Sequence, residues 1–292
     1  MFCAMFLNFL HSFYAKMFEA KLAKASTLKK IVSSIKDLIT DVPLECTENA
    51  LELQAMDGSH VALIYLHLGS DLFDAYRCDR SVKLGLPMKH LVTALKCSGS
   101  DDSCHLRFND TEESVTMVLV DEKHRRKQDI TLKLMDIDQE TLGIPDQKYT
   151  ATIDLPSSEF SKLVGDLSAF SDCLTIKAKA GEVQFESQGG ENGGNVVTYT
   201  SAEEAESDEE DESGDGKKKK KDYGVQITVT EPTCLSFSTK YLTQFSKASK
   251  LSDRVRLSMS SGVPIVVEYQ IEDAGYLKFY LAPKIEDDEM GQ

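Results

Sequence analysis

The feature that most constrains the fold is a pattern of amphipathic helices and short strands that occurs twice along the chain. In the first half, apolar residues recur at helical spacing from Leu28 to Ile39, and again from Met88 to Leu95 directly after Pro87. In the second half, the same spacing runs from Phe160 to Phe170 and from Tyr241 to Phe245. The period of about 120 residues is far longer than a solenoid repeat, so the pattern indicates two similar domains.

Short strands separated by turn residues occupy the intervals between these helices. Short, regular strands of this kind are typical of mostly antiparallel sheets. The sequence therefore predicts an α+β fold. The predicted strands are Val61 to Leu68, Val115 to Val120, Ile130 to Leu134, Thr175 to Phe185, Val225 to Val229, Val255 to Met259, Ile265 to Ile271 and Leu277 to Leu281.

Each predicted helix carries lysine opposite its apolar face. Lys29 and Lys36 lie on one face of the first helix, and Lys89 and Lys96 repeat this spacing on the second. A single such face is typical of any helix in solvent. Four of them, in a chain with a net charge of −15, indicate one surface that binds a polyanion. Contacts with phosphates carry no sequence information, so this surface would hold a duplex without selecting a site.

The overall charge excludes a protein that coats DNA nonspecifically. Asp and Glu number 48, against 33 Lys and Arg, so contact with DNA requires a local basic surface. Tryptophan is absent and aromatic residues do not interleave with the lysines, which argues against stacking on single strands. Seven cysteines without a C-x-x-C pair indicate a reducing, intracellular compartment rather than a disulfide framework.

Two segments differ from the rest in composition. Residues 1–16 are apolar but too short to span a bilayer, and they lack the features of a signal peptide. They are interpreted as an appendage, or as an upstream start codon read in frame ahead of Met17. Residues 201–222 contain no large apolar residue, which predicts a disordered loop. Its nine acids at 203–215 precede five lysines at 217–221, and these lysines are either a nuclear-import signal or part of a solvated linker.

Residues 135–148 lack sustained periodicity and are predicted to form an exposed linker between the halves. Three acids in this linker, Asp136, Asp138 and Glu140, could be imagined as metal ligands. They have no partnering histidine or carboxylate at a defined spacing, so no metal site is predicted. A metal-dependent enzyme of nucleic-acid metabolism stays open as an alternative function, which loss of activity in chelator would favour.

Two other clusters suggest chemistry only superficially. The first cluster consists of Cys97, Cys104 and His105. It could hold zinc only with a fourth ligand from elsewhere, so buried thiols are the preferred interpretation. The second cluster, Asp57, Ser59 and His60, is interpreted as a turn leading into a strand, because a catalytic triad is assembled from separated elements. Neither a P-loop nor a dinucleotide-binding glycine pattern occurs in the sequence.

A series of motifs covers the chain from Met17 to about Glu289 and is interrupted by the loop at 201–222. In order, they read MFEAKL, LKKIVSSIKDLI, LQAMDGSHVAL, FDAYRCDR, LKLMDID, LGIPDQ, VPIVVEY and GYLKFYLAPKIEDDE. On these motifs the chain resembles the proliferating cell nuclear antigen family of eukaryotic sliding clamps. The resemblance implies two domains of the DNA-clamp fold in a closed homotrimeric ring, with helices lining a channel around duplex DNA and antiparallel sheets outside.

The resemblance also implies a function. The expected protein is a nuclear processivity factor that encircles duplex DNA and docks replicative DNA polymerase, the clamp loader and other replication and repair proteins through short motifs. It implies no catalysis, cofactor, metal or membrane contact. A clamp relative that assembles as a heterotrimer is a further alternative, which a mass measurement would distinguish. The implied parts are an appendage (1–16), an N-terminal clamp domain (17–134), an interdomain connector (135–148), a C-terminal clamp domain (149–285) with the insertion 201–222, and an acidic tail (286–292).

Basic residues that line the channel are carried over by resemblance. They are Lys21, Lys29, Lys30, Lys36, Arg77, Lys96, Lys162, Lys240 and Lys247. The stretch from Arg77 to Lys96 matches the DNA-binding region of the family. Thr93 and Gly165 stand where relatives often carry a basic residue, which implies a somewhat weaker positive potential in the channel.

Clients of the family insert a short motif, with a glutamine, an aliphatic residue and two aromatic residues on one helical turn, into an apolar pocket beside the connector. The pocket carried over by resemblance is Met56, His60, Val61, Leu63, Leu142, Ile144, Pro145, Pro264, Tyr280, Ala282 and Pro283. Ordinary core packing is an alternative for Leu63, but less so for Ile144 and Pro145 in a polar linker. Part of the same motif spacing occurs within residues 1–16, which could occupy this pocket themselves.

Subunit contact is implied between a strand of one protomer and a strand of the next, which would cover two sheet edges. The residues carried over are Asp129, Ile130, Leu132 and Leu134 on one strand and Asn195, Val196, Val197 and Tyr199 on the other. The family lysine that receives ubiquitin aligns with Ala180, next to Lys179. Regulation through that position is therefore left open.

Overall fold

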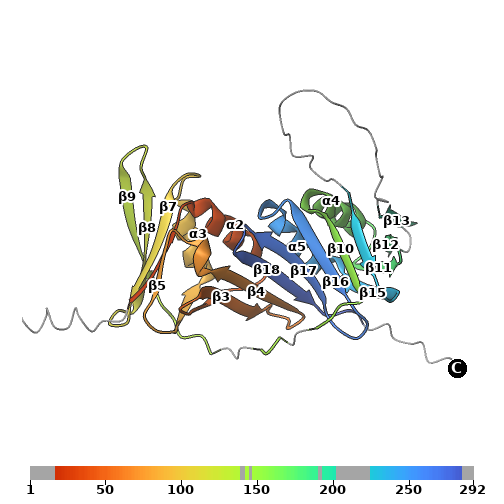
Figure 1. Ribbon diagram of the computed structural model, residues 1–292, viewed down its shortest axis with the longest axis horizontal. Helices are drawn as coiled ribbons and strands as arrows, with labels where there is room; N and C mark the ends of the chain where they lie inside the picture. Colours follow the sequence, from red (N-terminus) through yellow and green to blue (C-terminus); the bar gives the residue numbers. More distant parts are fainter. Residues whose placement is uncertain (1–16, 139–141, 145–146, 190–192, 202–223, 285–292) are drawn as a thin grey trace, which may run out of the picture. The chain divides into compact units, whose positions relative to one another are not determined.

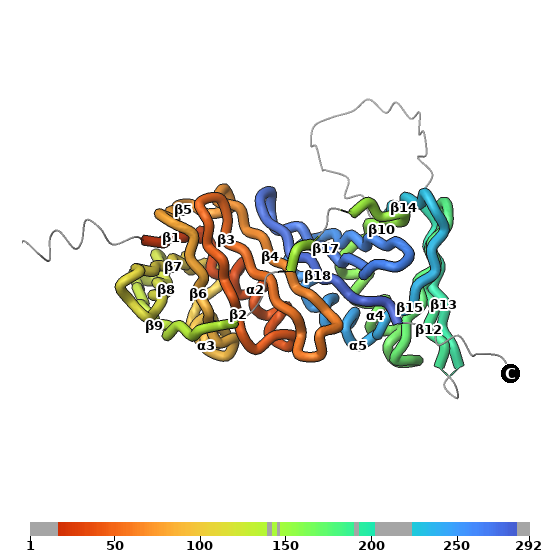
Figure 2. The backbone as a smooth tube through the Cα atoms, turned by 90° about the horizontal axis from the view of Figure 1, so that it is seen from below, coloured from red at the N-terminus to blue at the C-terminus, as the bar shows by residue number. Residues whose placement is uncertain are grey.

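The computed structural model describes residues 17–138, 142–144, 147–189, 193–201 and 224–284 (Figure 1, Figure 2). The appendage 1–16, residues 202–222 of the predicted insertion 201–222, and the tail 286–292 lie outside these residues. The chain divides into two compact units. Unit 1 comprises Met1–Pro145, Lys250–Ser252 and Tyr269–Phe279, and unit 2 comprises Asp146–Ser249, Asp253–Glu268 and Tyr280–Gln292.

Unit 1 is built from antiparallel strands and two helices. Its elements are β1 (Met17–Leu22), α2 (Ala25–Ile35), β2 (Asp41–Cys46), β3 (Ala50–Met56), β4 (Ala62–Gly69), a 3-10 helix (Ser70–Leu72), β5 (Ala75–Cys78), β6 (Val82–Pro87), α3 (Met88–Lys96), β7 (Ser103–Asn109), β8 (Ser114–Asp121) and β9 (Arg126–Lys133). One sheet has the strand order β5-β1-β7-β8-β9, and β4, β3, β2 and β6 are neighbours in a second sheet. Helices α2 and α3 lie side by side.

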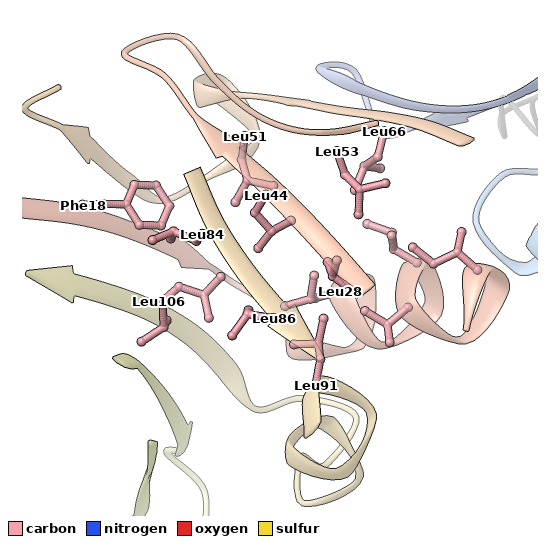
Figure 3. A pocket seen from close by; sticks show the side chains of 15 residues that line it. Phe18, Leu28, Leu44, Leu51, Leu53, Leu66, Leu84, Leu86, Leu91 and Leu106 are labelled. Atoms are coloured by element: carbon pink, nitrogen blue, oxygen red, sulfur yellow. The ribbon is translucent and has the colours of Figure 1, made fainter. Parts of the chain in front are cut away.

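The apolar faces of α2 and α3 form the core of unit 1 with the strands. Leu28 and Ile31 of α2 and Leu91 of α3 are buried. Figure 3 shows that Leu28 and Leu91 share this interior with Leu44 and Leu86 of the strands. The side chains enclose a cavity of about 30 Å³ that is lined by apolar residues alone. A cavity without polar groups offers a water molecule no hydrogen bonds, so it stays dry.

Unit 2 repeats the combination of antiparallel strands with two helices. Its elements are β10 (Ala151–Pro156), α4 (Ser157–Ser168), β11 (Cys173–Lys179), β12 (Glu182–Gly189), β13 (Gly193–Thr200), β14 (Gln226–Val229), β15 (Thr233–Ser238), α5 (Thr239–Ser246) and β16 (Arg254–Met259), with a 3-10 helix at Lys247–Lys250. The last two strands of the chain are β17 (Ile265–Ile271) and β18 (Gly275–Leu281). One sheet has the order β13-β12-β11-β15, and β14, β10 and β16 are neighbours. Helices α4 and α5 lie side by side over a core that includes Phe160, Phe185, Phe237 and Phe245.

The predicted α+β class with two similar halves is confirmed, since each unit pairs two helices with antiparallel strands (Figure 1). The expectation of a single strand from Thr175 to Phe185 is wrong. This segment is a hairpin of β11 and β12 whose turn contains Gly181, and the positive φ of 72° there suits glycine. The first helix ends at Ile35 rather than Ile39, so Lys36 lies at its C-cap.

Candidate nucleic-acid interface and docking surfaces

The lysines of the helix pair in unit 1 face solvent. Lys30, Lys36 and Lys96 are exposed, whereas Lys29 is half-buried. The Nζ of Lys29 donates a hydrogen bond to the carbonyl of Ser98, just beyond the end of α3, at 3.0 Å. Because this bond joins α2 to the end of α3, Lys29 supports the helix pair as well as adding positive charge.

Lys21 and Arg77 extend the predicted basic set onto strands β1 and β5, which pair antiparallel. The Nε and Nη2 of Arg77 donate hydrogen bonds to the two carboxylate oxygens of Asp79 at 2.7 and 2.9 Å. The hydrogen bonds to Asp79 raise the pKa of Arg77 and also offset its charge. Arg77 is therefore a weaker source of positive potential than an exposed helix lysine such as Lys96.

In unit 2, the paired helices and the turn that follows them carry three more of the predicted lysines. Lys162 on α4, Lys240 on α5 and Lys247 after it are exposed. The Nζ of Lys247 donates to Oε1 of Gln244 at 2.6 Å, within one helical turn. Gly165 is exposed on the same helix as Lys162, and a Cβ placed there would meet nothing within 4 Å.

A tight turn between β3 and β4 positions the first group of predicted pocket residues. Asp57 is buried, and its carboxylate accepts hydrogen bonds from the backbone N–H groups of Ser59, Val61 and Ala62 at 3.0, 2.8 and 2.7 Å. His60 adopts the left-handed conformation with φ 58°. The prediction that this cluster forms a turn rather than a catalytic triad is confirmed, because Asp57 binds the backbone of the turn.

Apolar side chains near this turn remain in contact with solvent. Val61 is 37% exposed and Leu142, in the linker, is 43% exposed. Leu63 is half-buried on the face of β4 opposite its fully buried residues, and it pairs across the strands with Met56. Leu63 therefore keeps accessible surface and is not one of the fully buried core residues of unit 1.

The linker that carries Leu142 is held to unit 1 at two points. The N–H of Met135 donates to the carbonyl of Gly85 at 2.9 Å, and a Cβ on Gly85 would lie 2.1 Å from the Met135 oxygen, so only glycine allows this approach. Farther along, Nε2 of Gln54 donates to the Leu142 carbonyl at 2.8 Å, and Oε1 of Gln54 accepts the Leu142 N–H at 2.5 Å. Gln54 could not be predicted from the sequence, because no local pattern signals a contact between residues 88 positions apart.

The other predicted pocket residues are distributed over the chain as follows. Ile144 is half-buried in unit 1, and Pro145 lies outside the described residues. Four residues belong to unit 2, of which Pro264 and Ala282 are exposed and Tyr280 and Pro283 are half-buried. Each of the described members retains accessible surface.

The predicted subunit contacts lie on two sheet edges. Within the described part of the chain, β9 is the last strand of one sheet in unit 1 and β13 is the last strand of one sheet in unit 2. Each is eight residues long, whereas β5 and β15 at the opposite edges have four and six residues. Val196 on β13 is 53% exposed. A long edge with an exposed apolar side chain is typical of a surface that another strand covers.

Comparison with known proteins decides the family. Residues 17–141 match the family described as proliferating cell nuclear antigen, N-terminal domain, and residues 143–284 match the corresponding C-terminal domain. The chain belongs to the proliferating cell nuclear antigen family. It is 50% identical over 274 residues to the proliferating cell nuclear antigen of Caenorhabditis elegans, covering 94% of this chain and 99% of the relative. It is 41% identical over 275 residues to that of Chaetomium thermophilum, covering 94% and 100%.

As a member of the proliferating cell nuclear antigen family, the protein is a DNA sliding clamp and a processivity factor for DNA polymerase. It is a scaffold and not an enzyme, so the alternative of a metal-dependent enzyme is wrong. It binds DNA, polymerases, the clamp loader and other clients, and it forms a homotrimer. None of the helices in the described ranges is long and apolar enough to cross a membrane.

The residues considered as metal ligands do not gather into a metal site in the described part of the chain. Among the residues that the structure describes, no group of three or more His, Cys, Asp or Glu could hold a metal ion. Asp136 and Asp138 are exposed, and Glu140 lies outside the described residues. Cys104 is buried, which raises the pKa of its thiol to about 12. Cys97 is exposed, so the expectation of buried thiols holds for Cys104 and is wrong for Cys97.

Proposed function

We propose that this clamp holds duplex DNA through basic residues on its helices and on strands β1 and β5. The observation that carries the proposal is that each helix pair buries its apolar side and presents lysine to solvent. Phosphate contacts add in parallel and select no sequence, which suits a clamp that slides. The proposed contacts are Lys21, Lys29, Lys30, Lys36, Arg77, Lys96, Lys162, Lys240 and Lys247.

Replacing Lys96, Lys162 and Lys247 together by alanine should reduce retention on DNA and stimulation of polymerase, most strongly at moderate salt. These three are preferred to Lys29, whose removal also breaks the hydrogen bond to Ser98. Each lost phosphate contact should lower the slope of log affinity against log salt by about 0.9. The slope is measured from the DNA affinity of the trimer at a series of salt concentrations.

A matched variant replaces Lys123, Lys177 and Lys179, which are also exposed but lie on strands and turns outside the helices and outside the stretch from Arg77 to Lys96. It removes the same three charges, so it separates the effect of net charge from that of position. An equal change of slope in both variants, or no change in the first, would contradict the proposed DNA contacts.

We propose further that client peptides dock on the residues carried over from the family pocket. The support is that Val61 and Leu142 are large apolar side chains that stay exposed in the folded chain. A docking site for an apolar peptide motif needs apolar side chains that stay accessible in this way. The proposed pocket consists of Met56, His60, Val61, Leu63, Leu142, Ile144, Pro145, Pro264, Tyr280, Ala282 and Pro283.

Replacing Ile144 and Tyr280 together by alanine should weaken binding of a client-motif peptide by about 100-fold or more. The two truncations remove apolar contact area worth a few kcal/mol to a docked peptide, and each 1.4 kcal/mol changes affinity roughly tenfold. Calorimetry gives the affinity, and replacing the half-buried Ile227 of β14 by alanine serves as the control. Wild-type affinity in the double variant would refute the pocket.

Protomers of the homotrimer are proposed to join by pairing β9 of one with β13 of the next. The support is that both are long edge strands, and pairing would satisfy their outer backbone groups. The proposed contacts are Asp129, Ile130, Leu132 and Leu134 with Asn195, Val196, Val197 and Tyr199.

Residues 17–134 and 149–285 are the proposed clamp domains, joined by the connector 135–148. The nucleus is the proposed location, in keeping with a replication factor.

A further inference from the structure

The contact between Gln54 and Leu142 has the form of a backbone pairing. The side-chain amide of Gln54 supplies a donor and an acceptor, and it uses both on the two backbone groups of one linker residue, at 2.8 and 2.5 Å. A neighbouring β-strand would satisfy Leu142 in the same way. Gln54 is half-buried on β3, between the buried Leu53 and Ala55 of the opposite face. Its amide is therefore directed outward, toward the linker.

The two anchors of the linker lie in one row across three strands. Gly85 on β6 pairs with Pro43 on β2. Continuing the β2–β3 register by one residue places Pro43 opposite Gln54. Because neighbouring strands are about 4.8 Å apart, the two anchors are about 10 Å apart. Met135 is thus bonded to β6 and Leu142 to β3.

This arrangement fixes the backbone of Leu142 but leaves its side chain accessible. The side chain is 43% exposed, although both backbone groups are bonded. Ordering a flexible segment when a ligand binds costs conformational entropy, and a segment that is ordered beforehand does not incur that cost again. Because the backbone of Leu142 is already bonded, an apolar ligand that contacts its side chain does not incur the entropy cost of ordering this residue.

We propose that Gln54 is a positioning residue for client binding, which holds Leu142 on the sheet so that its side chain is presented to an incoming client peptide. The proposal rests on the proposed client pocket. Gln54 acts through the linker backbone, and the apolar side chains make the contact with the peptide.

The first test measures the clamp without a client. In the Gln54→Met variant of the full-length trimer, the side chain keeps its length but loses the amide, so hydrogen exchange at the Leu142 N–H should become about tenfold faster. Gln54→Asn keeps an amide that is too short to reach, and it should behave like Gln54→Met. The control is Gln270→Met, the same change at an exposed glutamine of β17 in unit 1. Unchanged exchange at Leu142 in Gln54→Met would overturn the proposal.

The second test measures affinity for a client-motif peptide by calorimetry. We expect Gln54→Met and Gln54→Asn to bind about tenfold more weakly than wild type, with unchanged DNA affinity and trimer mass, while Gln270→Met binds normally. Ile144→Ala is measured alongside as a test of the pocket itself. If Ile144→Ala weakens binding and Gln54→Met does not, the positioning role is wrong and the pocket stands. If neither variant weakens binding, the pocket is wrong and the proposal falls with it.

Discussion

Glu52 accepts hydrogen bonds on the outward face of β3 and joins two neighbouring side chains of β4. The Tyr65 hydroxyl donates to Oε1 of Glu52 at 2.7 Å, and Nδ1 of His67 lies 2.7 Å from the same oxygen. The ring of His67 stacks on Tyr276, with centroids 5.1 Å apart. Burial, followed by the hydrogen bond to Glu52, raises the pKa of Tyr65. The phenol therefore stays protonated in the folded protein at pH values where an unfolded chain would begin to ionise it.

Tyr65→Phe should lower the free energy of unfolding by about 1 kcal/mol at neutral pH, because Glu52 loses a donor. The folded pKa of Tyr65 lies above its unfolded value of about 10, so the contribution of the phenol is complete below pH ~10 and declines as the pH rises further. The difference between wild type and variant should therefore shrink in alkali. Urea denaturation at equal protomer concentration, at neutral and alkaline pH, measures both effects. A variant as stable as wild type at neutral pH would contradict the role assigned to this bond.

At the scale of secondary-structure elements, Gly165 lies within the continuous helix α4. It is exposed in the middle of α4, and its position has open space for a side chain. Glycine in a helix interior is less favourable than alanine, because it loses more backbone freedom on folding.

Gly165→Ala should raise the free energy of unfolding by about 0.5–1 kcal/mol, and denaturant midpoints compared at equal concentration measure the gain. Gly165→Lys should give part of this gain and also strengthen retention on DNA at moderate salt, because it adds a positive charge one helical turn from the exposed Lys162. A loss of stability in Gly165→Ala would show that the helix requires the glycine for a contact outside the isolated chain, such as one made in the trimer.

The elements that could be predicted from the sequence are those whose pattern depends on burial alone. All four helices of the described chain follow apolar residues at helical spacing. The same pattern predicts a first helix that is too long. Ile39 is buried and continues the apolar spacing, although α2 ends at Ile35. Periodicity reports which side chains are buried, and the end of a helix depends on local backbone geometry that it does not encode.

Several strands and part of the candidate site could not be predicted in this way. β13 alternates between exposed and half-buried residues, so its sequence lacks the strong apolar alternation of a core strand. The apolar members of the proposed pocket came from the family resemblance. Neither the sequence pattern nor the resemblance indicated the role of Gln54. That role depends on its contact with Leu142, a linker residue 88 positions away in sequence.

At the scale of the whole molecule, we expect the acidic and lysine-rich insertion to be dispensable for assembly. Deleting Ala202 to Lys221 should leave the protein a trimer, lighter only by the deleted residues, and should leave polymerase stimulation unchanged. Both flanks are held independently in the described chain: the N–H of Ser201 donates to the Gly181 carbonyl at 2.8 Å, and Arg254 donates to the Gly224 carbonyl at 3.1 Å. The deletion removes nine acids and five lysines, so the net charge changes from −15 to −11.

Light scattering of wild type and deletion variant at equal concentration measures the trimer mass. A matched control replaces the five lysines of the insertion by serine and retains its length. Dissociation of the deletion variant into monomers would show that the insertion is part of the assembly.

The two long sheet edges have a consequence for stoichiometry. β9 and β13 are different strands, one in each unit, so the proposed contact joins unlike surfaces head to tail. Such a contact closes into a ring of three only when each protomer is rotated by a third of a full turn from its neighbour, with no shift along the axis. A rotation that does not divide the full turn, or a shift along the axis, continues as an open helix. The number of protomers in the ring therefore depends on the angle of this contact as well as on its strength. A substitution that tilts either edge without weakening it would turn a closed ring into a growing fibre.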